Sequence, residues 1–290
     1  SINALDRGLQ TVQSQSAQEL ALLTGTGGEL EGMARELAGL NGAIRDSQRV
    51  GAQPNDLMDR RDLLLDRLSG LAQVSVTDDG AGSIRVTLGG AAGAHVDGTT
   101  VTWPAPAMPS PGGRIGALMD AASPTGSIAA YRADLAGVAQ TLTTQVNAIY
   151  NPAAGTDFFA YDAGTATLSI SPAITSATLV TGTGGAPGAN DAAVALSELR
   201  GRPGGPDDGY ARLVTRIGTE VADARRATVN ATALSGSIED RRQSASGVSL
   251  DEEMTNLIRF QRGYQAAARA MTTTDSLLET LINRTGRVGL

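Results

Sequence analysis

The stretch SGVSLDEEMTNLIRFQRGYQAAARAMTTTDSLLETLI, residues 246–282, holds three consecutive acidic residues and then runs on with hardly an interruption. Ser249 and Glu252 stand three residues apart, which is the spacing of a capping box, in which each side chain accepts a backbone N–H of the first turn. Asp251 and Glu253 fall in the same turn, where the helix dipole favours negative charge. The acidic run therefore predicts a helix start capped by Ser249 and Glu252 rather than a catalytic or metal-binding cluster.

Behind this cap, the side chains of one helix face recur in alternating steps of four and three residues. The positions are Leu250, Met254, Leu257, Gln261, Tyr264, Ala268, Met271, Asp275, Leu278 and Ile282. Such a repeat predicts a long helix that packs against other helices in a coiled coil or bundle. Gln261 and Asp275 are polar positions on this stripe, a known way of fixing register or partner at a cost in stability.

Shorter stretches elsewhere carry apolar side chains at the same helical spacing. They lie at residues 1–23, 30–44, 57–71, 115–149 and 210–238. In the third of these, Arg61 is a polar exception on an otherwise leucine-lined stripe. Because each stripe is narrow, we expect the helices to pack on one another.

The pattern changes to a period of two residues at Val74. VSVTDDGAGSIRVTLGG (74–90) alternates apolar and polar residues around a Gly-containing turn, which predicts a β-hairpin. HVDGTTVTWP (95–104) predicts a third short strand or a second small hairpin, and the Pro-rich stretch 104–113 predicts a boundary. Residues 153–200 are irregular, with one or two short strands expected.

These patterns predict a mainly α fold with small β inserts: a discontinuous, elongated helical bundle with coiled-coil-like seams and a small outer β subdomain. We expect four parts. They are a discontinuous bundle domain at 1–73, 113–150 and 205–248, a β-hairpin subdomain at 74–112, an irregular insert at 151–204, and a long C-terminal helix at 249–290.

Composition and charge argue against several functional classes. Aromatic residues make up only 3% of the chain, which favours thin cores made of small helical bundles and short sheets. The net charge of −7 and the absence of a basic run argue against nucleic-acid binding. Without cysteine the chain has no disulfide and no thiolate nucleophile. No stretch approaches the roughly 18 apolar residues of a membrane span, so membrane insertion is not expected.

No constellation of residues points to catalysis. The single histidine, His95, lies in a Gly-rich β region, and we interpret it as a surface or turn residue. The DDG triplets at 78–80 and 207–209 do not continue into calcium-binding loops, and the two TGTGG stretches lack the Lys-Ser/Thr end of a phosphate loop. We therefore predict that the chain is not an enzyme and uses neither a metal nor another cofactor.

Three stretches carry a resemblance to a known family. SLDEEMTNLIRFQRGYQAAARAMTTTDSLLETLIN (249–283) resembles the C-terminal segment shared by bacterial flagellar axial proteins of the rod, hook and hook-associated group. PNDLMDRRDLLLDRLSGLAQVSV (54–76), and GTDFFAYDAG (155–164) leading to GAPGANDAAVALSELR (185–200), are similar to the hook-associated protein 1 family. The likeness covers most of residues 30–290 in order.

The resemblance implies a structural subunit that joins the flagellar hook to the filament. Members of the family form a ring at the hook tip through an inner tube of terminal helices, and they leave the cell by the flagellar type III route without a cleaved signal. The implied partners are further copies of the chain, the hook protein, the next hook-associated junction protein and an export chaperone. Carried over to this sequence, the helix Leu250–Ile282 serves both assembly and chaperone binding.

The sequence departs from the family in two respects. The family's N-terminal helix is missing upstream of Ser1, so we expect the chain to be a fragment of a longer protein. TGTGG (24–28) predicts a break by local rules, whereas the resemblance predicts a continuous helix; we favour a helix with a distorted turn.

Two other functions stay open at this stage. One is a rod or hook subunit of the same apparatus. The other is a cell-surface protein that binds or cleaves glycans from a helical stalk, although the sequence singles out no carboxylate pair for such chemistry.

Overall fold

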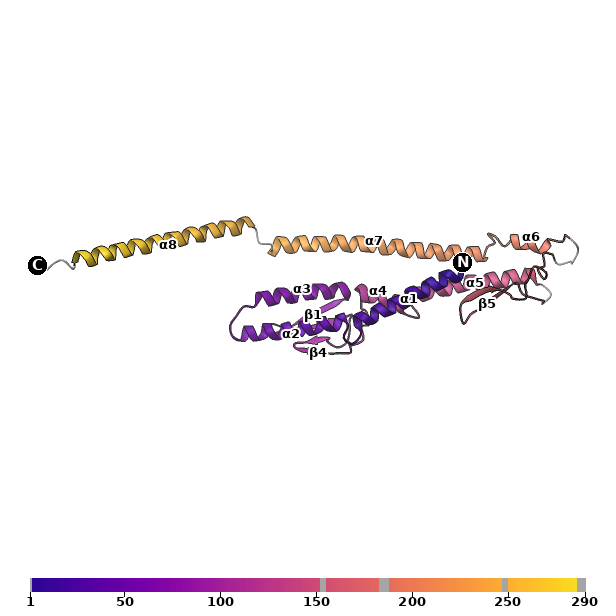
Figure 1. The fold of residues 1–290 in the computed structure, drawn as a ribbon, viewed down its shortest axis with the longest axis horizontal. Helices are drawn as coiled ribbons and strands as arrows, with labels where there is room; N and C mark the ends of the chain where they lie inside the picture. Colours follow the sequence, from indigo (N-terminus) through magenta and orange to yellow (C-terminus); the bar gives the residue numbers. More distant parts are fainter. Residues whose placement is uncertain (1, 152–154, 183–187, 247–249, 286–290) are drawn as a thin grey trace. The chain divides into compact units, whose positions relative to one another are not determined.

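The computed structural model shows a mainly helical chain with two small antiparallel sheets (Figure 1). It describes the backbone of residues 2–151, 155–182, 188–246 and 250–285. Within these ranges, side chains are described up to residue 244 and again from 254 to 281. The chain divides into two compact units, residues 1–217 and 218–290. The predicted fold class, mainly α with small β inserts, is confirmed; the four-part division of domains stays a prediction.

The helices and strands follow one another in the order that the sequence patterns suggest. The helices are α1 (Ile2–Thr24), α2 (Glu29–Arg49), α3 (Asn55–Leu71), α4 (Gly113–Ala122), α5 (Ser127–Tyr150), α6 (Asp191–Ser197), α7 (Pro206–Ser246) and α8 (Leu250–Thr285). The strands are β1 (Val74–Gly80), β2 (Ser83–Leu88), β3 (Val96–Asp97), β4 (Thr100–Val101), β5 (Phe159–Asp162) and β6 (Thr167–Ile170).

The favoured interpretation of TGTGG, a helix that continues through a distorted turn, is wrong, because α1 ends at Thr24 and α2 begins at Glu29. Gly27 adopts a φ of +77°, in the left-handed region that glycine tolerates best. Its N–H donates to Glu31 Oε2 at 2.6 Å, so a carboxylate of the new helix satisfies a backbone donor of the turn. This bond is the largest cause of the lowered pKa of Glu31, followed by the bond from Arg35. The local glycine rule therefore prevails over the resemblance at this point.

The main core of the first unit lies between α2, α3 and the four-stranded sheet, whose order is β1-β2-β3-β4. Its side chains are almost entirely aliphatic. They include Leu30, Leu37, Leu64, Leu68, Val86, Leu88, Val96 and Ile115. The polar exception Arg61 is buried among them and donates from Nη1 to the carbonyl of Gly82 at 2.8 Å. The exception on the predicted stripe thus joins α3 to the β1–β2 turn.

A second apolar layer of the same unit is built on α5. Leu135, Val138, Val146 and Tyr150 of this helix are buried, and the ring of Tyr150 packs edge-on against Phe158 at a centroid distance of 5.2 Å. The hairpin β5–β6, which the sequence predicts as one or two short strands, follows directly.

Three asparagine side chains fix the β elements to the helices. Asn41 of α2 accepts from the N–H of Ile84 at 3.4 Å and donates to its carbonyl at 2.9 Å and to that of Gly98 at 2.8 Å. Asn147 of α5 makes the same two-point contact with Phe159 of β5, at 2.9 and 2.8 Å. Asn3 of α1 does so with Leu168 of β6, at 3.0 and 2.8 Å. Each amide takes the place of a neighbouring strand.

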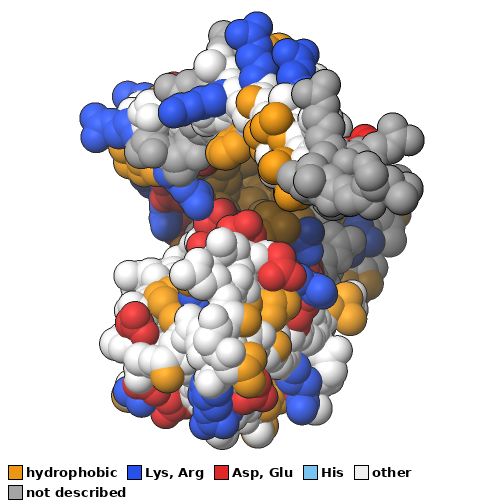
Figure 2. Space-filling view, turned by 90° about the vertical axis from the view of Figure 1, so that its left-hand side faces the viewer, with side chains coloured by type: hydrophobic (Ala, Val, Ile, Leu, Met, Phe, Trp, Pro, Cys, Tyr) orange, Lys and Arg blue, Asp and Glu red, His pale blue; other side chains and the backbone are white. Residues whose placement is uncertain are grey.

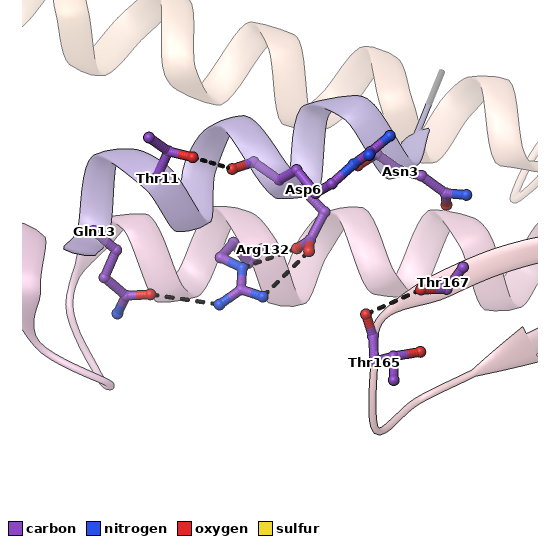
Figure 3. Close-up of polar contacts among 8 residues, drawn as sticks. Asn3, Asp6, Thr11, Gln13, Arg132, Thr165 and Thr167 are labelled. Atoms are coloured by element: carbon purple, nitrogen blue, oxygen red, sulfur yellow. Dashed lines mark hydrogen bonds and ion pairs between the residues drawn. The ribbon is translucent and has the colours of Figure 1, made fainter. Parts of the chain in front are cut away.

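An ion pair joins α1 to α5 within the first unit (Figure 3). Arg132 donates from Nε and Nη2 to the two oxygens of Asp6, at 2.8 and 3.2 Å, and the carboxylate is buried. Gln13, also on α1, accepts a weaker third bond from the same guanidinium at 3.5 Å. The pKa of Arg132 is raised chiefly by the bond to Asp6. Such a two-pronged contact fixes direction as well as distance, so it sets how α1 lies along α5.

The interpretation of His95 as a surface or turn residue is wrong: its side chain is 0% exposed. The imidazole Nδ1 accepts from the N–H of Leu88 at 3.2 Å, and Nε2 has no partner within the described residues. Its backbone N–H donates to Val86 and its carbonyl accepts from Thr102. His95 therefore links β2 to the segment after β4, and burial lowers the pKa of the imidazole.

We expect Asn41→Ala to destabilise the first unit by about 2–4 kcal/mol, because it leaves the two buried backbone groups of Ile84 and the half-buried carbonyl of Gly98 without their partner. Asn41→Asp keeps the shape but brings a carboxylate against two carbonyls, so the loss is at least as large. Urea unfolding of both variants measures the effect. Asn230→Ala, on the exposed surface of α7, is the matched control and changes stability by no more than about 0.5 kcal/mol.

We expect the chain to lose stability as the pH falls below about 6.5, the ordinary pKa of histidine. Since burial lowers the pKa of His95 in the folded chain, the unfolded chain binds a proton that the folded chain does not, between these two pKa values. The loss proceeds at no more than about 1.4 kcal/mol per pH unit and levels off below the folded pKa. His95→Asn keeps an acceptor for the N–H of Leu88 but has no imidazole to protonate. The free energy of unfolding of this variant should therefore fall less between pH 7.5 and pH 5 than that of the unaltered chain.

The chain has a single histidine, so one imidazole signal in an NMR titration reports its pKa directly. A pKa at or above the ordinary value would contradict the prediction.

Candidate assembly surfaces

The helix predicted from residues 246–282 is α8, and its stripe faces outward. Met254, Leu257, Gln261, Tyr264, Ala268, Met271 and Leu278 are all exposed. The side chain of Tyr264, for example, is 79% exposed. The side chains of Leu250 and Ile282 lie outside those described, as does the predicted cap of Ser249 with Glu252, although the helix does begin at Leu250. Within the second unit, the described side chains of the stripe are therefore open to solvent.

A second apolar stripe on α8 escaped the sequence prediction. Each of its residues directly precedes a residue of the first stripe in the sequence. They are Phe260, Gly263, Ala267, Ala270, Leu277 and Leu281. Phe260 is 77% exposed, and it lines a shallow groove with Gly263, Tyr264 and Ala267. The signal for this stripe was present, because its residues repeat with the same steps of three and four. At 100° per residue, the two stripes together cover an arc of about 160° of the helix.

Helix α7 offers a similar but sparser surface in the second unit. Val221, Val229, Leu234 and Ile238 are exposed there. The first turns of the same helix belong to the first unit, where Leu213 is buried and Arg216 pairs with Asp134 of α5 at 2.8 Å. The beginning of α7 is therefore a packed element, whereas the part from Gly218 onward exposes its apolar side chains.

Arginines accompany these apolar side chains on α8. Arg259, Arg262 and Arg269 all lie outside the two stripes along the helix. Figure 2 shows that, on the face it draws, orange hydrophobic side chains lie open to solvent beside blue basic ones. An apolar arc bordered by charge is typical of a helix that binds other helices, because the charged residues keep the free surface in water until a partner covers the arc.

The described residues offer little chemistry besides packing. Among them, no three side chains of His, Cys, Asp or Glu gather closely enough to hold a metal ion. Nor is any helix of the described chain long and apolar enough to cross a membrane. The candidate site is therefore the apolar surface of α8.

Two family models match the chain, one at each end. Residues 1–103 match the flagellar hook-associated protein FlgK helical domain, and residues 241–284 match the flagellar basal body rod FlgEFG protein C-terminal region. The first match covers α1 to β4 and the second covers α8 with the end of α7. The apolar surface of α8 thus lies in a segment that flagellar rod and hook proteins share.

Individual relatives cover short parts of their own length. Flagellar hook-associated protein 1 of Bacillus subtilis is 46% identical over 79 residues, which is 27% of this chain and 16% of that protein. Its counterpart in Escherichia coli is 38% identical over 77 residues, 27% of this chain and 14% of the relative. The flagellar hook protein FlgE of Helicobacter pylori is 37% identical over 79 residues, 27% of this chain and 11% of the relative. The matched part is about a sixth or less of each relative.

Among solved structures, the flagellar hook junction protein FlgK from Burkholderia pseudomallei aligns with 56% of this chain and 34% of its own, with a TM-score of 0.45 and 22% identity. The two family models and the three curated relatives are all flagellar proteins. The match of residues 1–103 and the two relatives named hook-associated protein 1 support a FlgK-type hook-associated protein.

Proposed function

We propose that the chain is a structural subunit of the bacterial flagellum that joins the hook to the filament and assembles through its terminal helices. The observation that carries the proposal is the exposed apolar arc of α8, in a segment that matches flagellar rod and hook proteins. A helix of 36 residues with large side chains open to water gains free energy only when another helix covers it. Each large side chain covered contributes about 1.5–3 kcal/mol.

The partners that fit this role are further copies of the chain in a ring, the hook protein, the next hook-associated junction protein and an export chaperone. We propose that the stripe Leu250–Ile282 serves both assembly and chaperone binding. The two uses agree physically, because an apolar stripe that is to be covered in the flagellum needs cover beforehand in the cytoplasm. The site of action is outside the cell, after export without a cleaved signal, and the role requires no catalysis.

The proposed role assigns a task to each predicted part. In this role the helical bundle is the structural body of the subunit, and the C-terminal helix at 249–290 makes the assembly contacts. The β-hairpin subdomain at 74–112 and the insert at 151–204 face outward. The distribution of buried side chains supports this assignment. The core consists of aliphatic side chains of α2, α3 and the sheet, whereas the large side chains of α8 are exposed.

A second candidate is a rod or hook subunit of the same apparatus. The match of residues 241–284 to rod proteins and the relative named flagellar hook protein favour it. Against it stands the match of residues 1–103, which is to the helical domain of hook-associated proteins.

We expect the double change Leu257→Asp and Leu278→Asp to weaken chaperone binding by at least about a hundredfold, because two large side chains of the stripe are replaced by charges. The matched control is Thr273→Asp with Thr280→Asp, which adds the same charge to the same helix on the face opposite the stripe. Calorimetric titration with the chaperone measures both, and circular dichroism checks that the β region stays folded. Equal affinity of the two double variants would mean that the stripe is not the binding surface.

Removal of the intact gene should give hooks without filaments and release flagellin into the medium. Electron microscopy of the cells and a flagellin assay of the supernatant measure the outcome. Loss of the hook as well would favour the rod or hook subunit, and normal flagella would refute both flagellar roles.

A further inference from the structure

The sulfur of this chain is distributed unevenly between core and surface. The chain has six methionines and no cysteine, so a methionine thioether is the only sulfur group that an oxidant can reach. Four methionines lie in the first unit and are at most 38% exposed; they are Met33, Met58, Met108 and Met119. Met254 and Met271 are 60% and 74% exposed, and both lie on α8, the helix coloured yellow in Figure 1. The two most exposed thioethers therefore belong to one helix.

Both methionines are members of the first apolar stripe of α8. Met254 stands three residues before Leu257, and Met271 stands three residues after Ala268. In a repeat of three and four residues, every member of the stripe faces the partner helix once the stripe is covered. An unbranched thioether side chain adapts its shape to such a contact. A polar atom added to either sulfur would thus enter the contact itself.

Hydrogen peroxide supplies such an atom without the help of a metal or a catalytic residue. The sulfur attacks one peroxide oxygen, the O–O bond breaks and an S–O bond forms. The sulfur gives up two electrons, and the second peroxide oxygen leaves as water. The product, methionine sulfoxide, is polar where the thioether was apolar. Since the reaction needs access to the sulfur, exposure decides which methionine reacts first.

We propose that Met254 and Met271 are oxidation sites of this chain, and that their conversion to methionine sulfoxide weakens the association of α8. In a covered stripe the sulfoxide oxygen loses its water and meets apolar side chains that offer no donor, which is unfavourable. The reaction itself follows from exposure, whereas its effect on association rests on the proposed function. A methionine sulfoxide reductase restores the thioether, so the loss of association is reversible.

Mass spectrometry of the full chain tests the selectivity. With limiting hydrogen peroxide, the peptides of Met254 and Met271 should gain one oxygen at least about fivefold faster than those of Met33 and Met108, which pack against the core. Circular dichroism before and after the reaction checks that the chain stays folded. Oxidation of Met33 as fast as that of Met254 in the folded chain overturns the proposal.

The effect on association is measured by calorimetric titration with the export chaperone. The oxidised chain should bind at least about tenfold more weakly than the unoxidised chain, and reductase treatment should restore the affinity. The double variant Met254→Leu with Met271→Leu keeps the apolar volume, so it binds before and after peroxide treatment alike. Met119→Leu is the matched control and loses affinity as the unaltered chain does. An equal loss in the double variant would place the damage elsewhere and refute the proposal.

The bound chaperone gives a second test that needs no variant. Because it covers the stripe, it should slow the oxidation of Met254 and Met271, while Met119 in the first unit reacts at an unchanged rate. Rates at Met254 and Met271 that are the same in the free and the bound chain contradict the proposal, since the two thioethers then lie outside the contact.

Failure of the proposed function is distinguishable from failure of this inference. If the unoxidised chain binds no chaperone, chaperone binding by the stripe is refuted, and an apolar chromatography matrix takes the place of the partner. The oxidised chain should then elute earlier than the unoxidised chain, whereas the double variant Met254→Leu with Met271→Leu should elute at one position before and after peroxide. Equal retention of the unaltered chain in both states overturns the inference.

Discussion

The β elements of this protein depend on one interaction, the pairing of an asparagine side chain with both backbone groups of a strand residue. Strands of two to seven residues cannot hold a sheet together in water by themselves. Asn41, Asn147 and Asn3 tie Ile84, Phe159 and Leu168 to three different helices, so each small sheet takes its place from the helix beside it. A buried amide is costly unless it is fully bonded, which makes these contacts directional as well as stabilising.

The two units differ in how far they bury their large apolar side chains. In the first, aliphatic side chains fill a core, the buried ion pair of Asp6 with Arg132 orients α1, and Arg61 closes onto Gly82. In the second, α8 exposes Phe260 and Tyr264, although the whole chain is only 3% aromatic. A chain that places scarce aromatic rings outside its own core gains their burial energy only from a partner. Stability is thus concentrated in the first unit and the capacity for association in the second.

Periodicity predicted most of the elements, because period and burial arise from the same local geometry. It predicted the long helix α8 and the β1–β2 hairpin, and it singled out Arg61 as an exception on its stripe. It failed where a distant contact decides: nothing next to His95 reveals that Leu88 and the core enclose it, and nothing next to Asn41 reveals Ile84. The second stripe of α8 was not predicted for another reason: one repeat of three and four residues already accounts for a packed helix, and α8 carries two such repeats side by side. At TGTGG the local glycine rule held and the resemblance misled.

Two surfaces of the described chain are uncovered, the apolar arc of α8 and the edge of β1, and they depend on different features of the sequence. The α8 surface consists of side chains, because the helix backbone is satisfied within itself, so exchanging leucine for aspartate would weaken the proposed contact. The open edge of β1 presents backbone groups instead, and such groups pair with little dependence on the side chains beside them. Edge strands are usually blunted by charge or by covering, as Asn3 and Asn147 do on the smaller sheet. On β1 the acidic side chains stand only at the far end, at Asp78 and Asp79, so the run from Val74 to Thr77 has no charge to blunt its open edge.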